Sequence, residues 1–261
     1  MMRPRIAIPV PNSKRPMYVR LALPQYEQAV RSVGGQPVII ELNATPAEIA
    51  QAVKACDGVL LPGSPADVDP EKYGAERHPK TAASDPFRDN TDELLLQDAY
   101  NMRKPVFGIC YGIQSLNVWR TGTLHQELAT GIKHAAGRKV TEAHRVAIDP
   151  ESKLAAILRD AGALPATNEF PVNSSHHQSP DVLGDGLRLA AWCPDDGVQE
   201  AVEGTSPDHF VLGVQWHPER SCDTDPASRA MFRAFVQAAA QWHERLQNRQ
   251  QDFESVARKG F

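Results

Sequence analysis

The chain has 261 residues and a formal net charge of −4 at pH 7, from 28 Lys and Arg against 32 Asp and Glu. This length can bury a sizeable core in one large α/β domain or two small ones, and the mildly acidic balance offers no electrostatic footprint for nucleic acid or an anionic membrane. The sequence has no spanning apolar run, no signal-peptide pattern and four scattered cysteines, so we expect a cytoplasmic enzyme or small-molecule binding protein with no nucleic-acid or membrane partner.

The first half of the chain alternates short apolar runs with amphipathic segments. Strands are predicted at residues 5–10, 37–42, 58–61 and 105–110, and helices at 23–33, 46–55, 88–101 and 111–119. The Thr45-Pro46 pair is a helix start signal, with proline in the first turn. This alternation predicts an α/β fold with a mostly parallel central sheet flanked by helices.

The second half is richer in strands. Residues 143–148, 187–192, 198–202 and 210–215 are strand-like, and we expect them to extend the same sheet in antiparallel fashion. Residues 227–240 form an apolar-faced helix, followed by a polar tail. We predict a single domain over residues 1–261 with a core from about 5 to 240, in which 241–261 is a C-terminal helix or tail.

A long proline-rich loop covers residues 63–87. It follows the carboxyl end of a predicted strand, where ligands bind in open α/β sheets. Long loops of this kind are usually functional or disordered. We expect this one to be functional.

The strongest local signal is the pentapeptide Gly108-Ile109-Cys110-Tyr111-Gly112 between a predicted strand and a predicted helix. It has the form glycine-x-nucleophile-x-glycine, in which a strained turn leaves no room for bulk two residues before or after the nucleophile. The N-terminus of the following helix would lower the pKa of the thiol and stabilise an oxyanion. A buried structural cysteine with packing glycines is the alternative.

His217 is the best candidate for a general base. It ends an apolar strand, Pro218 stops that strand, and Glu219 could turn back to accept the imidazole N–H. Alone this pattern could be an incidental histidine at a strand end. Together with the cysteine motif it predicts a Cys110–His217–Glu219 triad.

The motif around Cys110, with Gln114 and residues 216–219, resembles the class I glutamine amidotransferase superfamily. Residues 61–65, 85–89, 122–128 and 173–178 resemble its C26-type γ-glutamyl hydrolase branch, and more closely the γ-glutamyl-γ-aminobutyrate hydrolase group of polyamine catabolism and putrescine degradation. The resemblance runs from residue 5 to 240 and implies a flavodoxin-like fold of the amidotransferase type.

The resemblance also implies an activity: cleavage of the γ-glutamyl amide bond of small γ-glutamyl amines. Cys110 would form a thioester and release the amine, His217 would protonate the amine and activate water, and Glu219 would orient His217. Backbone N–H groups near Gly63 and Ser64 and of Tyr111 would form the oxyanion hole. The implied substrate-binding residues are Gln114, His176, Gln178 and Arg88, the last as a carboxylate contact or a loop anchor.

Tyr111 departs from the branch, which usually has arginine after the nucleophile, and Thr121-Gly122-Thr123 replaces Gly-Gly-Thr. Two alternative functions therefore stay open: a glutaminase subunit that supplies ammonia to a separate synthetase, and a non-catalytic binding protein. The expected partner is a small γ-glutamyl substrate; a homodimer is left open, and no cofactor is expected. No metal site is expected either. The spacing along the chain fits no zinc motif for any of the candidate histidines, which are His125, His134, His144, His176 and His177.

Overall fold

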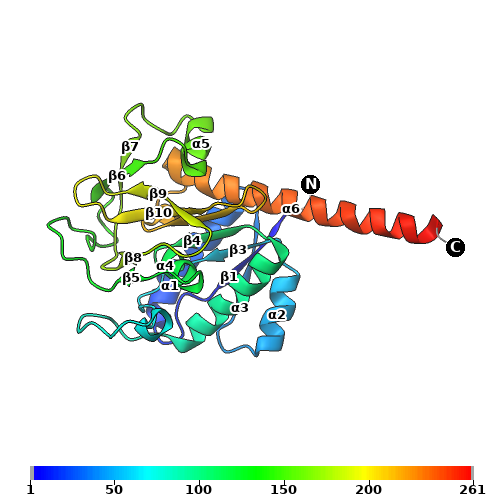
Figure 1. Cartoon of the computed structure of the whole chain (residues 1–261), viewed down its shortest axis with the longest axis horizontal. Helices are drawn as coiled ribbons and strands as arrows, with labels where there is room; N and C mark the ends of the chain where they lie inside the picture. The colour runs from blue at the N-terminus through cyan, green and yellow to red at the C-terminus, as the bar shows by residue number, and fades with distance from the viewer. Residues whose placement is uncertain (1–2, 260–261) are drawn as a thin grey trace.

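The computed structural model describes residues 3–259 and is organised around a nine-stranded mixed sheet (Figure 1). The strands occur in the spatial order β2-β1-β3-β4-β11-β10-β9-β6-β7, with the first five parallel and the remaining pairings antiparallel. This confirms the predicted α/β fold with an antiparallel extension. Their bounds are β1 (Arg5–Pro9), β2 (Gln36–Ile40), β3 (Gly58–Leu61), β4 (Val106–Ile109), β6 (His144–Ile148), β7 (Glu169–Val172), β9 (Leu187–Trp192), β10 (Gln199–Gly204) and β11 (Val211–Val214).

Helices cover both faces of the sheet. Along β1, Ile6 and Ile8 face a core shared with α1, α5 and α6, whereas Ala7 faces a second core shared with α2, α3 and α4. This alternation follows from the two-residue period of a strand. The helices are α1 (Pro16–Ser32), α2 (Pro46–Lys54), α3 (Pro86–Met102), α4 (Tyr111–Trp119), α5 (Lys153–Asp160) and α6 (Pro226–Lys259).

Local sequence signals fix several helix boundaries. At the start of α2, Thr45 and Glu48 form a capping box with Pro46 in the first turn, as the sequence predicted. The start of α1 was predicted wrongly. Helix α1 begins at Pro16, not at the predicted residue 23. Pro24 therefore lies inside the helix, although proline favours the first turn, and Ala22 before it is already buried.

Three features of the second half were not predicted. Helix α5 and strand β7 lie between β6 and β9, and a two-stranded sheet pairs β5 (Leu124–His125) with β8 (Ser179–Pro180). Helix α6 continues to Lys259 and extends away from the sheet in Figure 1, so the segment after residue 240 is helical as far as it is described; residues 260–261 lie outside the described part. Within the described chain, no helix has both the length and the apolar character needed to cross a membrane.

The carboxyl ends of three neighbouring parallel strands set the position of the predicted site. Leu61 of β3 pairs with Gly108 of β4, which pairs on its other side with Gly213 of β11. The segments that follow these strands therefore emerge side by side. They carry Gly63, Cys110 and His217 respectively.

Candidate active site

Gly63, Cys110 and His217 come together just beyond the three strand ends. The backbone N–H of Cys110 donates a hydrogen bond of 2.8 Å to the Val214 carbonyl, which ties the cysteine turn to β11. A Cβ atom built on Gly63 would lie 3.1 Å from Cε1 of His217 and 3.4 Å from Cβ of Cys110. The backbone of Gly63 therefore lies close to both side chains.

Cys110 lies in a strained turn between β4 and α4. Its φ of 54° and ψ of −106° are unusual for a residue with a side chain. A Cβ on Gly108 would approach the Gly112 backbone to 2.7 Å, and one on Gly112 would lie 2.2 Å from the Leu61 carbonyl oxygen. Both glycines are thus required, which confirms the steric reasoning drawn from the sequence.

The environment of Cys110 corrects one prediction. The thiol is only 7% exposed, and burial raises its pKa to about 12. Arg220 and the backbone N–H of Tyr111 act in the opposite direction, and Glu219 adds to the increase. The predicted lowering of the pKa by the helix N-terminus is therefore wrong for this state, because the cost of desolvating a thiolate is larger.

His217 and Glu219 form a buried pair. Nδ1 of His217 lies 2.8 Å from Oε1 of Glu219, and the two residues are 2% and 6% exposed. Burial lowers the pKa of His217, and Glu219 offsets this only in part. Burial would raise the pKa of Glu219, but His217 and Arg220 hold it below its ordinary value. The arrangement is a neutral imidazole beside an ionised carboxylate, as a triad requires.

Two further residues support this pair. The Asn173 side chain donates to the His217 carbonyl at 2.9 Å and accepts from the His217 N–H at 3.1 Å. Arg220 donates to the hydroxyl of Ser175 at 2.8 Å, and its Nε lies 3.6 Å from Glu219. Sequence reasoning assigned neither residue a role, although Asn173 begins the 173–178 segment that carried part of the resemblance.

The predicted oxyanion-hole residues lie on both sides of Cys110. The backbone N–H of Tyr111 is directed at the Cys110 sulfur. The backbone N–H of Gly63 donates to the Tyr26 hydroxyl at 3.0 Å, so it could bind an oxyanion only after that hydroxyl moves. The hydroxyl of Ser64 is used within the loop, where the Ala66 N–H donates to it at 3.1 Å.

Two of the predicted substrate-binding residues are connected to each other. The side-chain amide of Gln114 donates to the Gln178 carbonyl at 3.1 Å and to Oε1 of Gln215 at 3.2 Å. The side chain of Gln178 donates in turn to the Gln126 carbonyl at 2.9 Å. Helix α4, which follows Cys110, is thereby tied to the 173–178 segment.

Arg88 is placed as a loop anchor. Its side chain is 0% exposed and pairs with Asp92 at 2.7 Å. It donates to the carbonyls of Pro11 at 2.9 Å and Pro62 at 2.6 Å, and it lies over the Tyr111 ring at 4.8 Å. Contact with a substrate carboxylate, the other sequence prediction, does not fit this geometry because the guanidinium is closed to solvent and already bonded.

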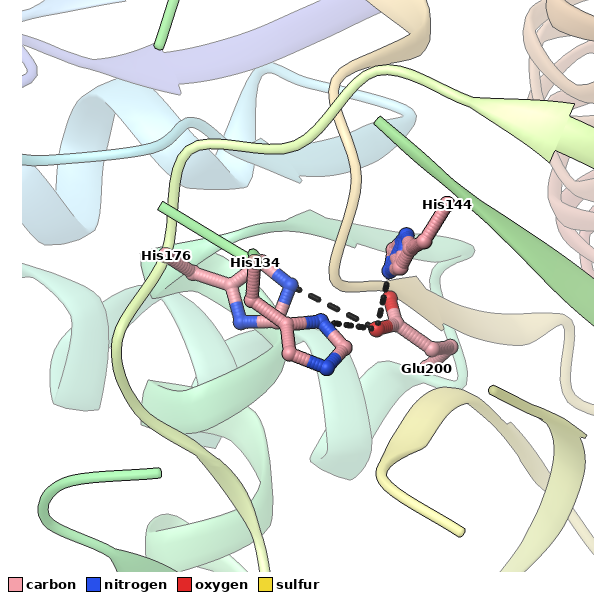
Figure 2. Close-up of side chains that lie close together, drawn as sticks. All are labelled: His134, His144, His176 and Glu200. Carbon is pink, nitrogen blue, oxygen red and sulfur yellow. Dashed lines mark hydrogen bonds and ion pairs between the residues drawn. The ribbon is translucent and has the colours of Figure 1, made fainter. Parts of the chain in front are cut away.

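His176 belongs to a cluster that sequence spacing did not reveal. Its Nε2 lies 3.4 Å from Oε1 of Glu200, and its Nδ1 lies 2.9 Å from the Gln178 carbonyl oxygen. His134 and His144 approach the same Glu200 oxygen (Figure 2). His176 therefore points toward Glu200, and these four side chains lie together in a way that the spacing along the sequence did not indicate.

Comparisons with known proteins agree on the family. A family model described as Peptidase C26 matches residues 11–219. The chain is 34% identical over 224 residues to the gamma-glutamyl-gamma-aminobutyrate hydrolase PuuD of Escherichia coli, covering 82% of this chain and 84% of the relative. It is 31% identical over 218 residues to protein NtpR of Enterococcus hirae, and the match covers 81% of this chain and 87% of that protein.

A solved structure shares the fold. A Thermoplasma acidophilum protein, described as a candidate component of GMP synthase, superposes with a TM-score of 0.62 over 95% of this chain and 99% of its own. Its sequence identity is 16%. This likeness bears on the fold alone.

Proposed function

Because the chain belongs to the Peptidase C26 family, we propose that it hydrolyses the γ-glutamyl amide bond of small γ-glutamyl amines resembling γ-glutamyl-γ-aminobutyrate. The products are glutamate and an amine. The family and the relatives named gamma-glutamyl-gamma-aminobutyrate hydrolase support a hydrolase of C–N bonds. The choice of small γ-glutamyl amines rests on the relatives' names and on the 173–178 segment.

One observation carries the proposal. Cys110, which is buried and has a strained backbone, packs with His217 against Gly63, and Nδ1 of His217 is hydrogen-bonded to Glu219. A nucleophile, a base and a group that orients the base are the parts that acyl transfer through a covalent intermediate needs. The Nε2 atom of His217 has no hydrogen-bond partner among the described residues. It is therefore available for proton transfer.

The first half of the reaction starts from neutral groups. The raised pKa of Cys110 and the lowered pKa of His217 favour a thiol and a neutral imidazole before substrate binds. Sγ attacks the γ-carbonyl carbon while Nε2 of His217 takes the thiol proton. Glu219 stabilises the imidazolium that forms. His217 then gives this proton to the leaving amine as the C–N bond breaks, and a γ-glutamyl thioester remains on Cys110.

The second half returns the enzyme to its starting state. His217 takes a proton from a water molecule, whose oxygen attacks the thioester carbonyl. The C–S bond breaks, the proton passes from His217 to the sulfur, and glutamate leaves. The backbone N–H of Tyr111 would stabilise the oxyanion in both halves. Every step uses groups of this chain and water only.

A glutaminase subunit that delivers ammonia to a separate synthetase is the second candidate. Tyr111 favours it, because the γ-glutamyl hydrolase branch usually has arginine at this position. In the structure the Tyr111 hydroxyl donates to Asp89, and the Arg88 guanidinium lies over its ring. This side chain is thus part of the loop anchor, and the backbone N–H is its contribution to the reaction.

A substrate panel separates the candidates. The purified chain is incubated with γ-glutamyl-γ-aminobutyrate, other γ-glutamyl amines, glutamine and folyl-polyglutamate, and released amine, ammonia and glutamate are measured. Turnover of γ-glutamyl amines by the isolated chain, lost in Cys110→Ala, supports the hydrolase. Glutamine turnover that needs an added synthetase supports the second candidate, and turnover unchanged in Cys110→Ala contradicts both.

A further inference from the structure

Three imidazole rings and one carboxylate that take no part in the proposed proton transfers converge in the interior (Figure 2). Nδ1 of His134, Nε2 of His144 and Nε2 of His176 lie 3.1, 2.9 and 3.4 Å from the same oxygen, Oε1 of Glu200. All four side chains are buried. We refer to these four residues as the histidine–glutamate cluster.

The hydrogen-bond partners of the outer nitrogens set the tautomer that two of these rings adopt when they are neutral. Nε2 of His134 lies 2.9 Å from an oxygen of Asp196, and Nδ1 of His176 lies 2.9 Å from the Gln178 carbonyl oxygen. Both partners accept hydrogen bonds, so these ring nitrogens carry the N–H. In a neutral ring the inward nitrogen then presents a lone pair to the oxygen of Glu200, another acceptor.

This leaves polar atoms in a buried place without partners. The inward nitrogens of neutral His134 and His176 face Oε1 of Glu200 without a proton to donate, and the second oxygen of Glu200 has no hydrogen-bond partner among the described residues. Unpartnered buried polar atoms are costly. A cation between them would turn each facing lone pair into a ligand.

The spacing of the donor atoms suits a tetrahedral metal ion. Zinc binds imidazole nitrogen and carboxylate oxygen at about 2.0–2.2 Å, so donors in a tetrahedral site lie about 3.3 Å apart. The three distances to Oε1 of Glu200 bracket this value, and all four donor atoms lie within 4.8 Å of one another. Donor atoms that lie farther apart than this would have to move inward to bind one ion.

The surroundings of two of the three histidines also match those of a metal site, whereas Nδ1 of His144 has no hydrogen-bond partner among the described residues. Ligand histidines usually donate their outer N–H to a carboxylate or a carbonyl, as His134 does to Asp196 and His176 to Gln178. Asp196 is itself held by the Thr130 hydroxyl at 2.6 Å. A dication would be balanced by the carboxylates of Glu200 and Asp196, so the buried group would be neutral overall.

We propose that the histidine–glutamate cluster binds one zinc ion, or a divalent transition-metal ion of like preference, as a closed structural site. Imidazole-rich donor sets suit zinc better than magnesium or calcium, which prefer oxygen. Four protein ligands leave no open position for catalysis.

The ligands come from four places: the segment after β5, the start of β6, the segment between β7 and β8, and β10. His176 lies between Asn173, which holds the backbone of His217, and Gln178, which holds Gln114. An ion bound to His176 would therefore fix the segment that supports the proposed base.

The test measures metal content and does not rely on activity. The full chain is produced without a polyhistidine tag in a Cys110→Ser background, which removes the active-site thiol as a competing ligand. It is stripped with chelator, reloaded with Zn²⁺ or Co²⁺, and freed of unbound metal by gel filtration. We expect one metal per chain, a higher Tm than the stripped protein, and a four-coordinate Co²⁺ spectrum without a thiolate charge-transfer band.

Variants locate the site. His144→Gln should lose stoichiometric metal, and Asp196→Asn should weaken affinity about 10- to 100-fold. Cys193→Ser should retain metal, although Cys193 lies beside His134 and Asp196 in an alternative grouping. His209→Gln should retain it as the matched buried histidine, since among the described residues the His209 ring hydrogen-bonds only to the Lys104 carbonyl.

Three results would overturn the proposal: a reloaded parent protein without bound metal, metal retained by His144→Gln, or metal lost only in Cys193→Ser. If His144→Gln does not fold, the Co²⁺ spectrum of the parent protein decides. A spectrum that is absent or shows thiolate ligation rejects the site. Failure here leaves the proposed hydrolysis untouched, because the substrate panel tests that activity independently.

Discussion

Nδ1 of His217 lies 2.8 Å from Oε1 of Glu219, while Nε2 on the opposite side of the ring has no hydrogen-bond partner among the described residues. The carboxylate accepts a hydrogen bond from Nδ1–H, and this leaves the lone pair on Nε2. The ring is thus held in the tautomer that can take a proton from a thiol. The proposed mechanism depends on this relationship.

Replacing Glu219 with glutamine tests it. Glu219→Gln keeps the shape but loses the charge that stabilises the imidazolium, and its amide can donate to Nδ1 and favour the other tautomer. We expect kcat to fall about 10²- to 10⁴-fold with a small change in KM. Steady-state kinetics on the best amide substrate, with circular dichroism as the folding control, makes the measurement. An unchanged kcat would remove Glu219 from the mechanism.

The pH dependence follows from the two shifted groups. Burial lowers the pKa of His217 below its ordinary 6.5, so the base stays neutral on mild acidification. The rate, kcat/KM, should therefore fall only as the pH drops below 6.5. Because the pKa of Cys110 is raised to about 12, alkylation of the substrate-free enzyme by iodoacetamide should accelerate continuously with pH. An alkylation plateau near neutral pH would instead show a stable thiolate.

The glycine after the nucleophile makes a steric prediction. A Cβ at Gly112 would lie 2.2 Å from the Leu61 carbonyl oxygen, so Gly112→Ala must displace β3 or the turn of Cys110. We expect a loss of about 1–3 kcal/mol of stability, about 2–4 °C in Tm for each kcal/mol, and most of the activity. Gly131→Ala is the control, since a Cβ there has no atom within 4 Å. Equal behaviour of the two variants would argue against the close packing.

Arg88 gives a prediction that separates an anchor from a substrate contact. Arg88→Met leaves the buried Asp92 without its partner, which should cost about 3–5 kcal/mol. The double variant Arg88→Met with Asp92→Leu should regain part of this loss, because no unpaired charge remains. Thermal unfolding measures both. A large increase in KM with an unchanged Tm would instead indicate that Arg88 binds substrate.

The parts of the site that could be predicted from sequence are those with a local cause. Cys110 is marked by two glycines that its turn requires, and His217 by an apolar strand stopped by Pro218. The pKa of Cys110 was predicted in the wrong direction. Burial depends on side chains that pack around the thiol from distant segments, and this outweighs the adjacent helix N-terminus.

No local sequence pattern indicates the histidine–glutamate cluster. Its ligands are separated by 10, 32 and 24 residues along the chain, from His134 to His144, then His176, then Glu200. No regular motif has this spacing, and β9 lies between the two strands that carry His144 and Glu200. Helix α5, which was also missed, did have local signals: Ser152 caps its start, and Leu154 and Leu158 are buried on one face.

The central claim is that Cys110 carries a γ-glutamyl thioester during turnover. The direct measurement is acid quenching during steady turnover of the best substrate from the panel, followed by mass spectrometry of peptides. We predict one glutamyl group on the peptide that contains Cys110, removed by hydroxylamine and absent from Cys110→Ala. Amide hydrolysis at the wild-type rate by Cys110→Ala, or a glutamyl group on another residue, would contradict the account.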